Sequence, residues 1–91
     1  MDKNIISCGE VLDISVVGKM YEELKVAIED ENAIELNASD LQRVDGAGIQ
    51  LLVAFFSEAE EMHVDVDWKE TSEQLLDAAS ILGVKSELHL N

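Results

Sequence analysis

The fold is decided by the stretch Leu36–Phe56, which reads LNASDLQRVDGAGIQLLVAFF. It starts at the end of an apolar run, crosses small polar residues and continues into an apolar segment with helical periodicity. Asp45 stands directly before that segment, where its carboxylate can accept hydrogen bonds from the first backbone N–H groups of a helix. The next residues, Gly46, Ala47 and Gly48, carry almost no side chain. We therefore expect a strand, a turn and a helix whose bare start lets another molecule approach the backbone.

These residues resemble the central motif of the STAS family, which includes anti-sigma factor antagonists and the cytoplasmic domains of sulfate transporters. The family pattern runs from a hydrophobic strand through D-L-S to I-D-[ST]-[AS]-G-L and an apolar helix. The corresponding residues here are Asn37–Ser39 and Val44–Ile49, and weaker matches lie at Val11–Ile14 and Leu75–Val84. The resemblance implies a short, single-domain bacterial member that binds other proteins and catalyses no reaction.

Two positions depart from the family motif, and both bear on regulation. In antagonist members the residue after the motif aspartate is a Ser or Thr that a partner kinase phosphorylates, whereas here it is Gly46, which has no hydroxyl. Asn37 stands where the family usually has an aspartate at the strand end. Ser39 matches the motif serine and Ser57 lies further along the helix, but neither aligns with the phosphoacceptor. The family's phosphorylation switch therefore cannot operate at Gly46.

The composition indicates one globular domain, residues 1–91. A chain of 91 residues, 47% of them hydrophobic, supplies one core and no second one. The apolar runs are too short to span a bilayer, and we expect no signal peptide because the N-terminus lacks that pattern. Its one cysteine, Cys8, can form no internal disulfide. This favours a reducing, cytoplasmic location and a place for Cys8 in the core.

The charge of the chain excludes whole classes of partner. A net charge of −14 repels nucleic acid and anionic membrane surfaces, because affinity for both comes from lysine and arginine. A basic protein surface is the natural partner for such a domain. The simpler explanation is that the acidic residues only keep a small protein soluble.

The N-terminal part predicts a hairpin and a helix. Two short strands, Ile5–Cys8 and Val11–Ile14, flank Gly9-Glu10, a pair suited to a two-residue hairpin turn. Ser15 can then cap a helix. The apolar positions of that helix follow 3.6-residue spacing: Val17, Met20, Tyr21, Leu24, Ala27 and Ile28.

The rest of the chain predicts alternating strands and helices. In order these are a strand over Ala33–Asn37, a helix over Asp45–Met62, a strand over Val64–Trp68 and a helix that ends at Gly83. Thr71 and Gln74 have the spacing of a capping box for the last helix. The tail Lys85–Asn91 carries Leu88 and Leu90 and can dock as a short element of unclear type.

Alternation along the strands predicts how the layers pack. Apolar residues alternate with polar ones, and we expect the polar set to face solvent: Asp13, Glu35, His63, Asp65 and Asp67. Helical connections between parallel strands cross over with a right hand. We therefore expect an α/β STAS fold with a four-stranded mixed sheet, an antiparallel N-terminal hairpin and three or more helices packed mainly on one face. The other face should be wet and acidic.

The central helix is more apolar than one buried face requires. One stripe holds Ile49, Leu52, Val53 and Phe56, and beside it lies a second, formed by Leu51, Phe55 and Met62. Together they span about 200° of the helix, whereas one core face needs roughly 100°. Either a neighbouring helix covers the second stripe, or Leu51 and Phe55 form an exposed patch for a partner.

No group of residues predicts catalysis, a metal site or a cofactor. Gly46-x-Gly48 lacks the third glycine of a dinucleotide fingerprint, and no P-loop lysine follows. His63, Asp65 and Asp67 share a strand face, but alternate strand residues point in parallel and surround an ion poorly. No Ser/His/Asp or Cys/His set has suitable local context. We expect no enzyme activity.

The sequence therefore predicts a cytoplasmic, acidic, STAS-like interaction module that binds its partner constitutively. The expected partner-binding residues are Asn37, Ser39, Asp45, Gly46, Ala47, Leu51 and Phe55. By resemblance, the partner is an anti-sigma kinase-like protein, a chemotaxis or two-component assembly, or an ABC-type lipid-transport ATPase with a small STAS subunit. Three other interpretations stay open: a nucleotide or anion sensor, a permanent subunit or homodimer, and a turn with no binding role.

Overall fold

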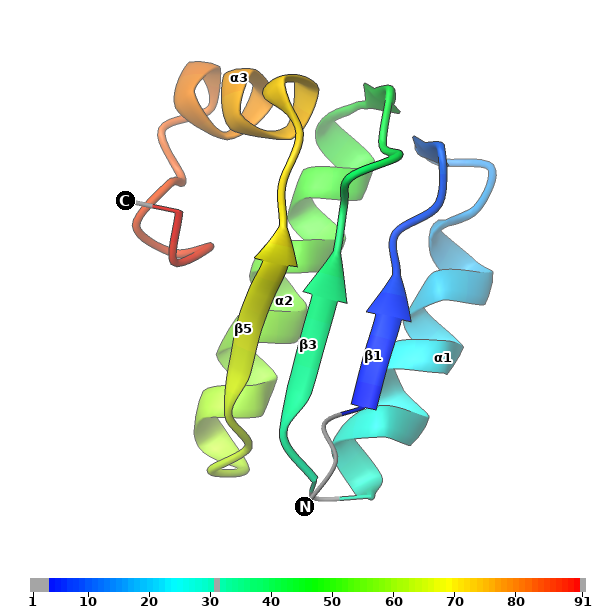
Figure 1. Ribbon diagram of the computed structural model, residues 1–91, viewed down its shortest axis with the longest axis vertical. Helices are drawn as coiled ribbons and strands as arrows, with labels where there is room; N and C mark the ends of the chain where they lie inside the picture. The colour runs from blue at the N-terminus through cyan, green and yellow to red at the C-terminus, as the bar shows by residue number, and fades with distance from the viewer. Residues whose placement is uncertain (1–3, 31, 91) are drawn as a thin grey trace.

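The computed structural model describes residues 4–30 and 32–90, which form one layer of strands and one layer of helices (Figure 1). The elements are, in order, β1 (Asn4–Ser7), β2 (Val11–Leu12), α1 (Val17–Glu29), β3 (Ile34–Asn37), β4 (Arg43–Val44), α2 (Gly46–Glu61), β5 (Val66–Glu70) and α3 (Glu73–Ile81). Strand–helix alternation with parallel pairing makes this an α/β fold.

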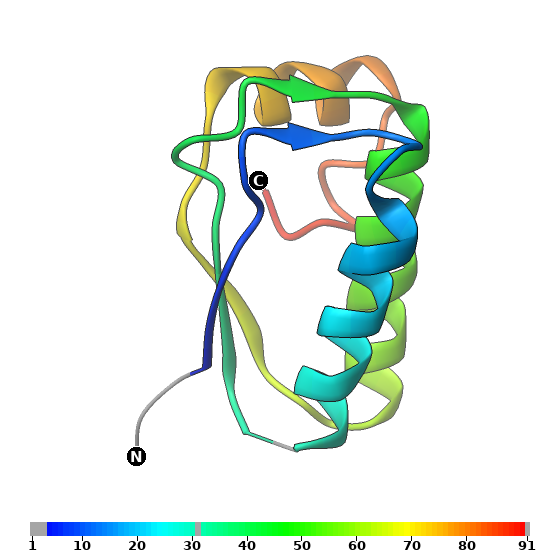
Figure 2. The same cartoon turned by 90° about the vertical axis from the view of Figure 1, so that its right-hand side faces the viewer.

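The sheet contains three parallel strands in the order β1-β3-β5, so that β3 is central. Ile6, Leu36 and Trp68 align across it. In Figure 2, α1 and α2 stand together on one side of these strands, while α3 and the separate β2–β4 pair close the end at which the strands finish. The prediction of helices mainly on one face is confirmed.

The predicted antiparallel hairpin is wrong. β1 pairs with β3 and β2 pairs with β4, in both cases in parallel, so the sheet is not the expected four-stranded mixed one. The backbone shows why: the Cys8 N–H donates to the Asn37 carbonyl oxygen at 2.9 Å, which continues the β3 pairing instead of folding the chain back. Gly9, with φ +74°, then redirects the chain so that β2 leaves the sheet.

Two predicted caps and one strand boundary also differ from the structure. Ser15 does not cap α1, which starts after Val16 without a side-chain cap. Ser72, not Thr71, caps α3, because the Leu75 N–H donates to the Ser72 hydroxyl oxygen at 3.2 Å. The strand predicted over Val64–Trp68 starts and ends two residues later, as β5. Capping spacing locates a helix start only to within a residue or two.

The core lies between the sheet and the two long helices. Nine side chains in it are almost completely inaccessible: Leu12, Leu24, Ile34, Leu36, Leu41, Ile49, Leu52, Leu75 and Leu88. Cys8 joins them as predicted, and burial raises the pKa of its thiol to about 11, with the Glu23 charge adding to the effect. The thiol therefore stays protonated near neutral pH and acts as a small apolar group.

The C-terminal segment docks on the body of the domain. Gly83, with φ +70°, follows the last residue of α3 and its C-cap, as predicted for a helix stop. Beyond it Leu88 is fully buried, and its carbonyl oxygen accepts a 2.8 Å hydrogen bond from the Trp68 indole nitrogen. The His89 ring lies 4.9 Å from the Phe56 ring, measured between centroids. The predicted docking is confirmed as a turn-rich segment; the predicted tail's last residue, Asn91, lies outside the described residues.

None of the helices in the described part of the chain has the length and apolar content needed to cross a bilayer. The longest, α2, has 16 residues and ends in charged side chains.

Candidate functional site

The strand-to-helix turn is built as its sequence predicts. The Asp45 carboxylate accepts a hydrogen bond from the Gly48 N–H at 3.0 Å, which confirms Asp45 as the N-cap of α2. The backbone N–H of Asp45 donates to the Leu12 carbonyl oxygen at 3.2 Å. The turn is therefore held at both ends, by its own helix and by β2.

The two glycines of the turn have different tasks. Gly48 is buried, and a Cβ atom placed on it would lie 2.2 Å from the Leu12 carbonyl oxygen. Gly46 is exposed, and a Cβ placed there would meet nothing within 4 Å. Gly48 thus lets α2 pack against β2. Gly46, the first residue of α2, leaves the exposed start of the helix without a side chain.

The predicted partner-binding residues fall into two places. Asp45 and Gly46 are exposed and Ala47 is half-buried, all at the start of α2. Asn37 and Ser39 lie at the end of β3, where the Asn37 side-chain oxygen accepts a 2.9 Å hydrogen bond from the Ser39 N–H. Strand β4 runs between the two places (Figure 2), so the structure does not bring them together around one point.

Phe55 cannot serve as the exposed apolar contact that the sequence suggested. Its side chain is only 4% exposed, and Leu51 is half-buried against the core. Phe55 is therefore covered within the domain, in which α1 packs alongside α2 (Figure 1). Met62, at the far end of the second apolar stripe, is about half exposed.

Sequence reasoning missed an exposed apolar residue beside the turn. The sequence predicted a strand over Val11–Ile14, yet β2 ends at Leu12 and the Ile14 side chain is 71% exposed. Because β2 pairs with β4, the chain after Leu12 passes beside the start of α2 (Figure 2). The sequence feature that could have located the end of this strand is the D-x-S pattern at Asp13–Ser15. The Asp13 carboxylate accepts a hydrogen bond from the Ser15 N–H, and this local turn directs the chain out of the strand.

A charged group accompanies this apolar contact. Hydrogen bonds from the Ser15 side chain and backbone hold the pKa of the Asp13 carboxyl below its usual value, and the Arg43 charge adds to this. Asp13 is therefore ionised near neutral pH. We call the set Asp13, Ile14, Asp45, Gly46 and Ala47 the turn surface, which includes an apolar side chain, a bare helix start and two carboxylates.

Replacing Asp45 with alanine should lower the free energy of unfolding by about 1 kcal/mol, because the Gly48 N–H then loses its capping acceptor. Urea denaturation followed by circular dichroism measures this change. Asp45→Asn keeps an acceptor and should recover most of the loss. Equal stability of the alanine variant and the parent would show that the cap contributes nothing.

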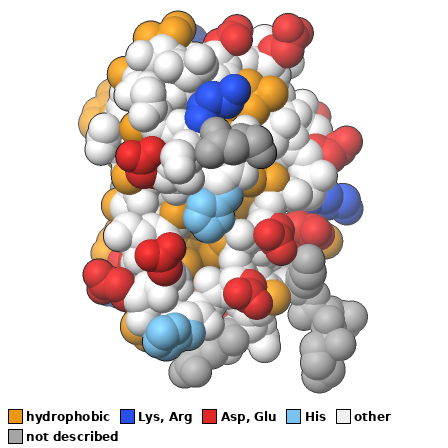
Figure 3. Space-filling view, turned by 90° about the vertical axis from the view of Figure 1, so that its left-hand side faces the viewer, with side chains coloured by type: hydrophobic (Ala, Val, Ile, Leu, Met, Phe, Trp, Pro, Cys, Tyr) orange, Lys and Arg blue, Asp and Glu red, His pale blue; other side chains and the backbone are white. Residues whose placement is uncertain are grey.

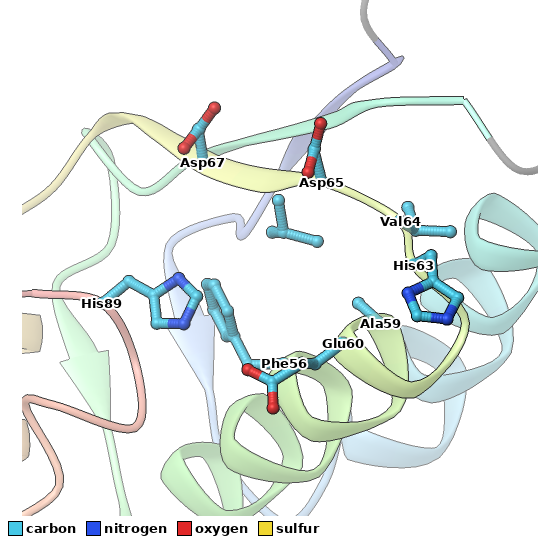
Figure 4. Close-up of a pocket in the computed structure, with 9 residues that line it drawn as sticks. Phe56, Ala59, Glu60, His63, Val64, Asp65, Asp67 and His89 are labelled. Carbon is cyan, nitrogen blue, oxygen red and sulfur yellow. The ribbon is translucent and has the colours of Figure 1, made fainter.

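The residues of the possible metal site do not converge on one point. His63, Asp65 and Asp67 line an open groove, and in Figure 4 the Asp65 and Asp67 carboxylates are directed away from the cavity. Within residues 4–30 and 32–90, no three His, Cys, Asp or Glu side chains are grouped so that they could hold a metal ion.

Comparison with known proteins connects this geometry to a family. A family model described as "Mlab, STAS domain" matches residues 2–90, nearly the whole chain. No match was found among curated proteins. The family match covers the central motif, the parallel sheet and the helix that Asp45 caps, so the chain belongs to the STAS domain family, whose members are in general non-catalytic protein-interaction modules.

Proposed function

We propose that this protein is a constitutive protein-binding module that docks its partner on the turn surface. The observation that carries the proposal is the exposed first residue of α2, Gly46, which has open space where a side chain would stand. The exposed Ile14 follows Leu12, whose carbonyl oxygen accepts the Asp45 N–H, by two residues and can supply an apolar contact, and apolar anchors at the centre of an interface commonly account for most of its binding energy.

Binding at this surface is not controlled by phosphorylation of Gly46, because glycine has no hydroxyl to accept a phosphoryl group. A phosphoryl group there would add roughly two negative charges beside Asp45 and oppose docking. Without it, occupancy depends on the amounts and affinities of the two proteins. This weakens an anti-sigma kinase-like partner more than a chemotaxis, two-component or ABC-transporter component.

The charge of the domain supports a basic partner surface. With a net charge of −14, complementary charge should speed the encounter, and salt should slow it. A nucleotide or anion receptor is less well supported, because the Asp45 carboxylate already accepts from the Gly48 N–H at the helix start. Calorimetry with GTP, ATP and phosphate should therefore record no binding heat.

The proposal is tested by identifying the partner and then perturbing the turn. Affinity capture from native lysate and mass spectrometry name a candidate, which is then purified and titrated against the domain. Gly46→Asp should weaken binding at least about tenfold, since it places a charged side chain on the docking point.

The matched control is Asn32→Asp, which adds the same charge in the exposed loop before β3, away from α2's start. It should change the affinity less than about twofold. If Gly46→Asp binds as tightly as the parent, the turn is not the contact. If both variants weaken binding equally, net charge alone explains the effect.

A further inference from the structure

A second hollow surface lies at the other end of α2, between α2, β5 and the C-terminal segment. It is a groove of about 470 Å³ whose apolar floor includes Phe56, Ala59 and Val66. In Figure 4 the Phe56 ring projects from α2 into the space below β5, and His89 enters from the C-terminal segment. We call it the α2–β5 groove. About 20 Å of helix separates it from the turn surface.

The groove runs beneath an outer edge of the three-stranded sheet. β5 is the last strand in the order β1-β3-β5, and no other described strand pairs with its outer side. Figure 1 shows β5 as the outermost strand of the layer. An edge strand presents backbone N–H and C=O groups that can pair with another chain, so this edge can accept an added strand.

The charges around the groove favour a positively charged binding partner. Glu60 stands on the α2 side and Asp65 stands directly before β5, while no lysine or arginine is among the described residues that line the groove. In Figure 3 acidic side chains flank a hydrophobic hollow on both sides of a histidine. The carbonyl end of α2 lies here as well, and a helix C-terminus favours positive charge.

The alternation along β5 separates the two kinds of contact. Val66 is buried and lines the groove. Asp65 and Asp67 are exposed, and in Figure 4 their carboxylates are directed away from the cavity. A strand added beside β5 would have the same alternation. Its apolar side chains would enter the groove, and its intervening side chains would lie on the same side as Asp65.

We propose that the α2–β5 groove binds an extended segment of a partner protein in which basic and apolar residues alternate. The segment adds to β5 as a strand, inserts an apolar side chain over Phe56 and Ala59, and places lysine or arginine beside Asp65. This surface is separate from the one proposed above, so the domain can hold two partner segments at once.

The probe is a synthetic peptide in which Lys or Arg alternates with Val or Leu, long enough to pair with the five residues of β5. Titration into the ¹⁵N-labelled full chain should shift the amide NMR signals of Glu60, Val66, Trp68 and His89. Backbone amides of β5 should exchange more slowly with solvent. Signals from Gly46 should not move.

Two altered peptides and a pair of protein variants test each part of the proposal. A central proline should abolish binding, because it removes a ladder hydrogen bond, and replacement of the basic residues by Glu should do the same. Asp65→Lys should weaken binding roughly five- to tenfold. Glu22→Lys makes the same charge change at an exposed position of α1 and should weaken binding less than about twofold.

Three results would overturn the proposal: no binding at millimolar peptide, equal binding of the proline peptide, or equal effects of Asp65→Lys and Glu22→Lys. Equal effects of the two lysine variants would show that the peptide binds only through general attraction to an acidic surface. Gly46→Asp should leave peptide binding unchanged, so failure of this proposal and failure of the turn surface are distinguishable. A doubling of mass in light scattering of the pure protein, lost on adding the peptide, would assign the edge to a second copy instead and would equally overturn it.

Discussion

Gly48→Ala is expected to destabilise the domain by about 3 kcal/mol or more, a large part of the stability of a protein of this size. The added methyl would lie 2.2 Å from the Leu12 carbonyl oxygen, a distance that real Cβ contacts do not reach. Leu12 is fully buried, and its carbonyl oxygen also accepts the Asp45 N–H, so β2 cannot retreat without breaking the turn. Urea denaturation followed by circular dichroism measures the loss.

Gly46→Ala is the matched control, because it adds the same methyl two residues earlier in the same helix. The space there is open, and alanine favours helix, so stability should stay the same or rise by up to about 1 kcal/mol. Similar effects of the two substitutions would contradict the distinction between a packing glycine and an exposed one. A stable Gly48→Ala variant would show that α2 does not press against β2 as described.

Leu88→Ala is expected to cost about 2–4 kcal/mol, even though Leu88 stands three residues from the C-terminus. Its side chain is fully buried, and its carbonyl oxygen holds the Trp68 indole at 2.8 Å. Removing the side chain leaves a cavity in the core and loosens the segment that carries His89. The same denaturation experiment gives the loss in free energy, and tryptophan fluorescence reports on the Trp68 contact.

The control for that variant is Ile81→Ala, which removes a comparable aliphatic side chain from a position 84% exposed at the end of α3. Its effect should stay within about 0.5 kcal/mol, because a solvated side chain contributes little burial. If Leu88→Ala is equally mild, the C-terminal segment does not belong to the core.

Much of the fold was predictable because its signals are local. The helical period, the capping aspartate at Asp45 and the glycine stop at Gly83 each depend on neighbours within one turn, and each is confirmed. The hairpin prediction failed for the opposite reason. The Gly9-Glu10 pair allows a tight turn, but whether Cys8 continues beside Asn37 depends on a strand almost thirty residues away.

The candidate site divides in the same way. The sequence located the bare start of α2, and the structure places Asp45 and Gly46 on the outside. It could not show that Phe55 is buried, nor that the Ile14 side chain is exposed beyond the end of β2. Whether a side chain is buried depends on the segment that packs against it, and the local sequence around that side chain does not contain this second segment.

By itself, the sequence determined the STAS motif, the absence of a hydroxyl at Gly46, the kinds of element and the acidic character of the domain. Only the tertiary structure decided that the described strands pair in parallel, that Gly48 is the packing glycine, and that β5 is the last strand of its sheet, above a groove. The physical reason is range. Torsional preference and capping act between neighbours along the chain, whereas strand partners, close approaches and cavities arise between segments that meet only after folding.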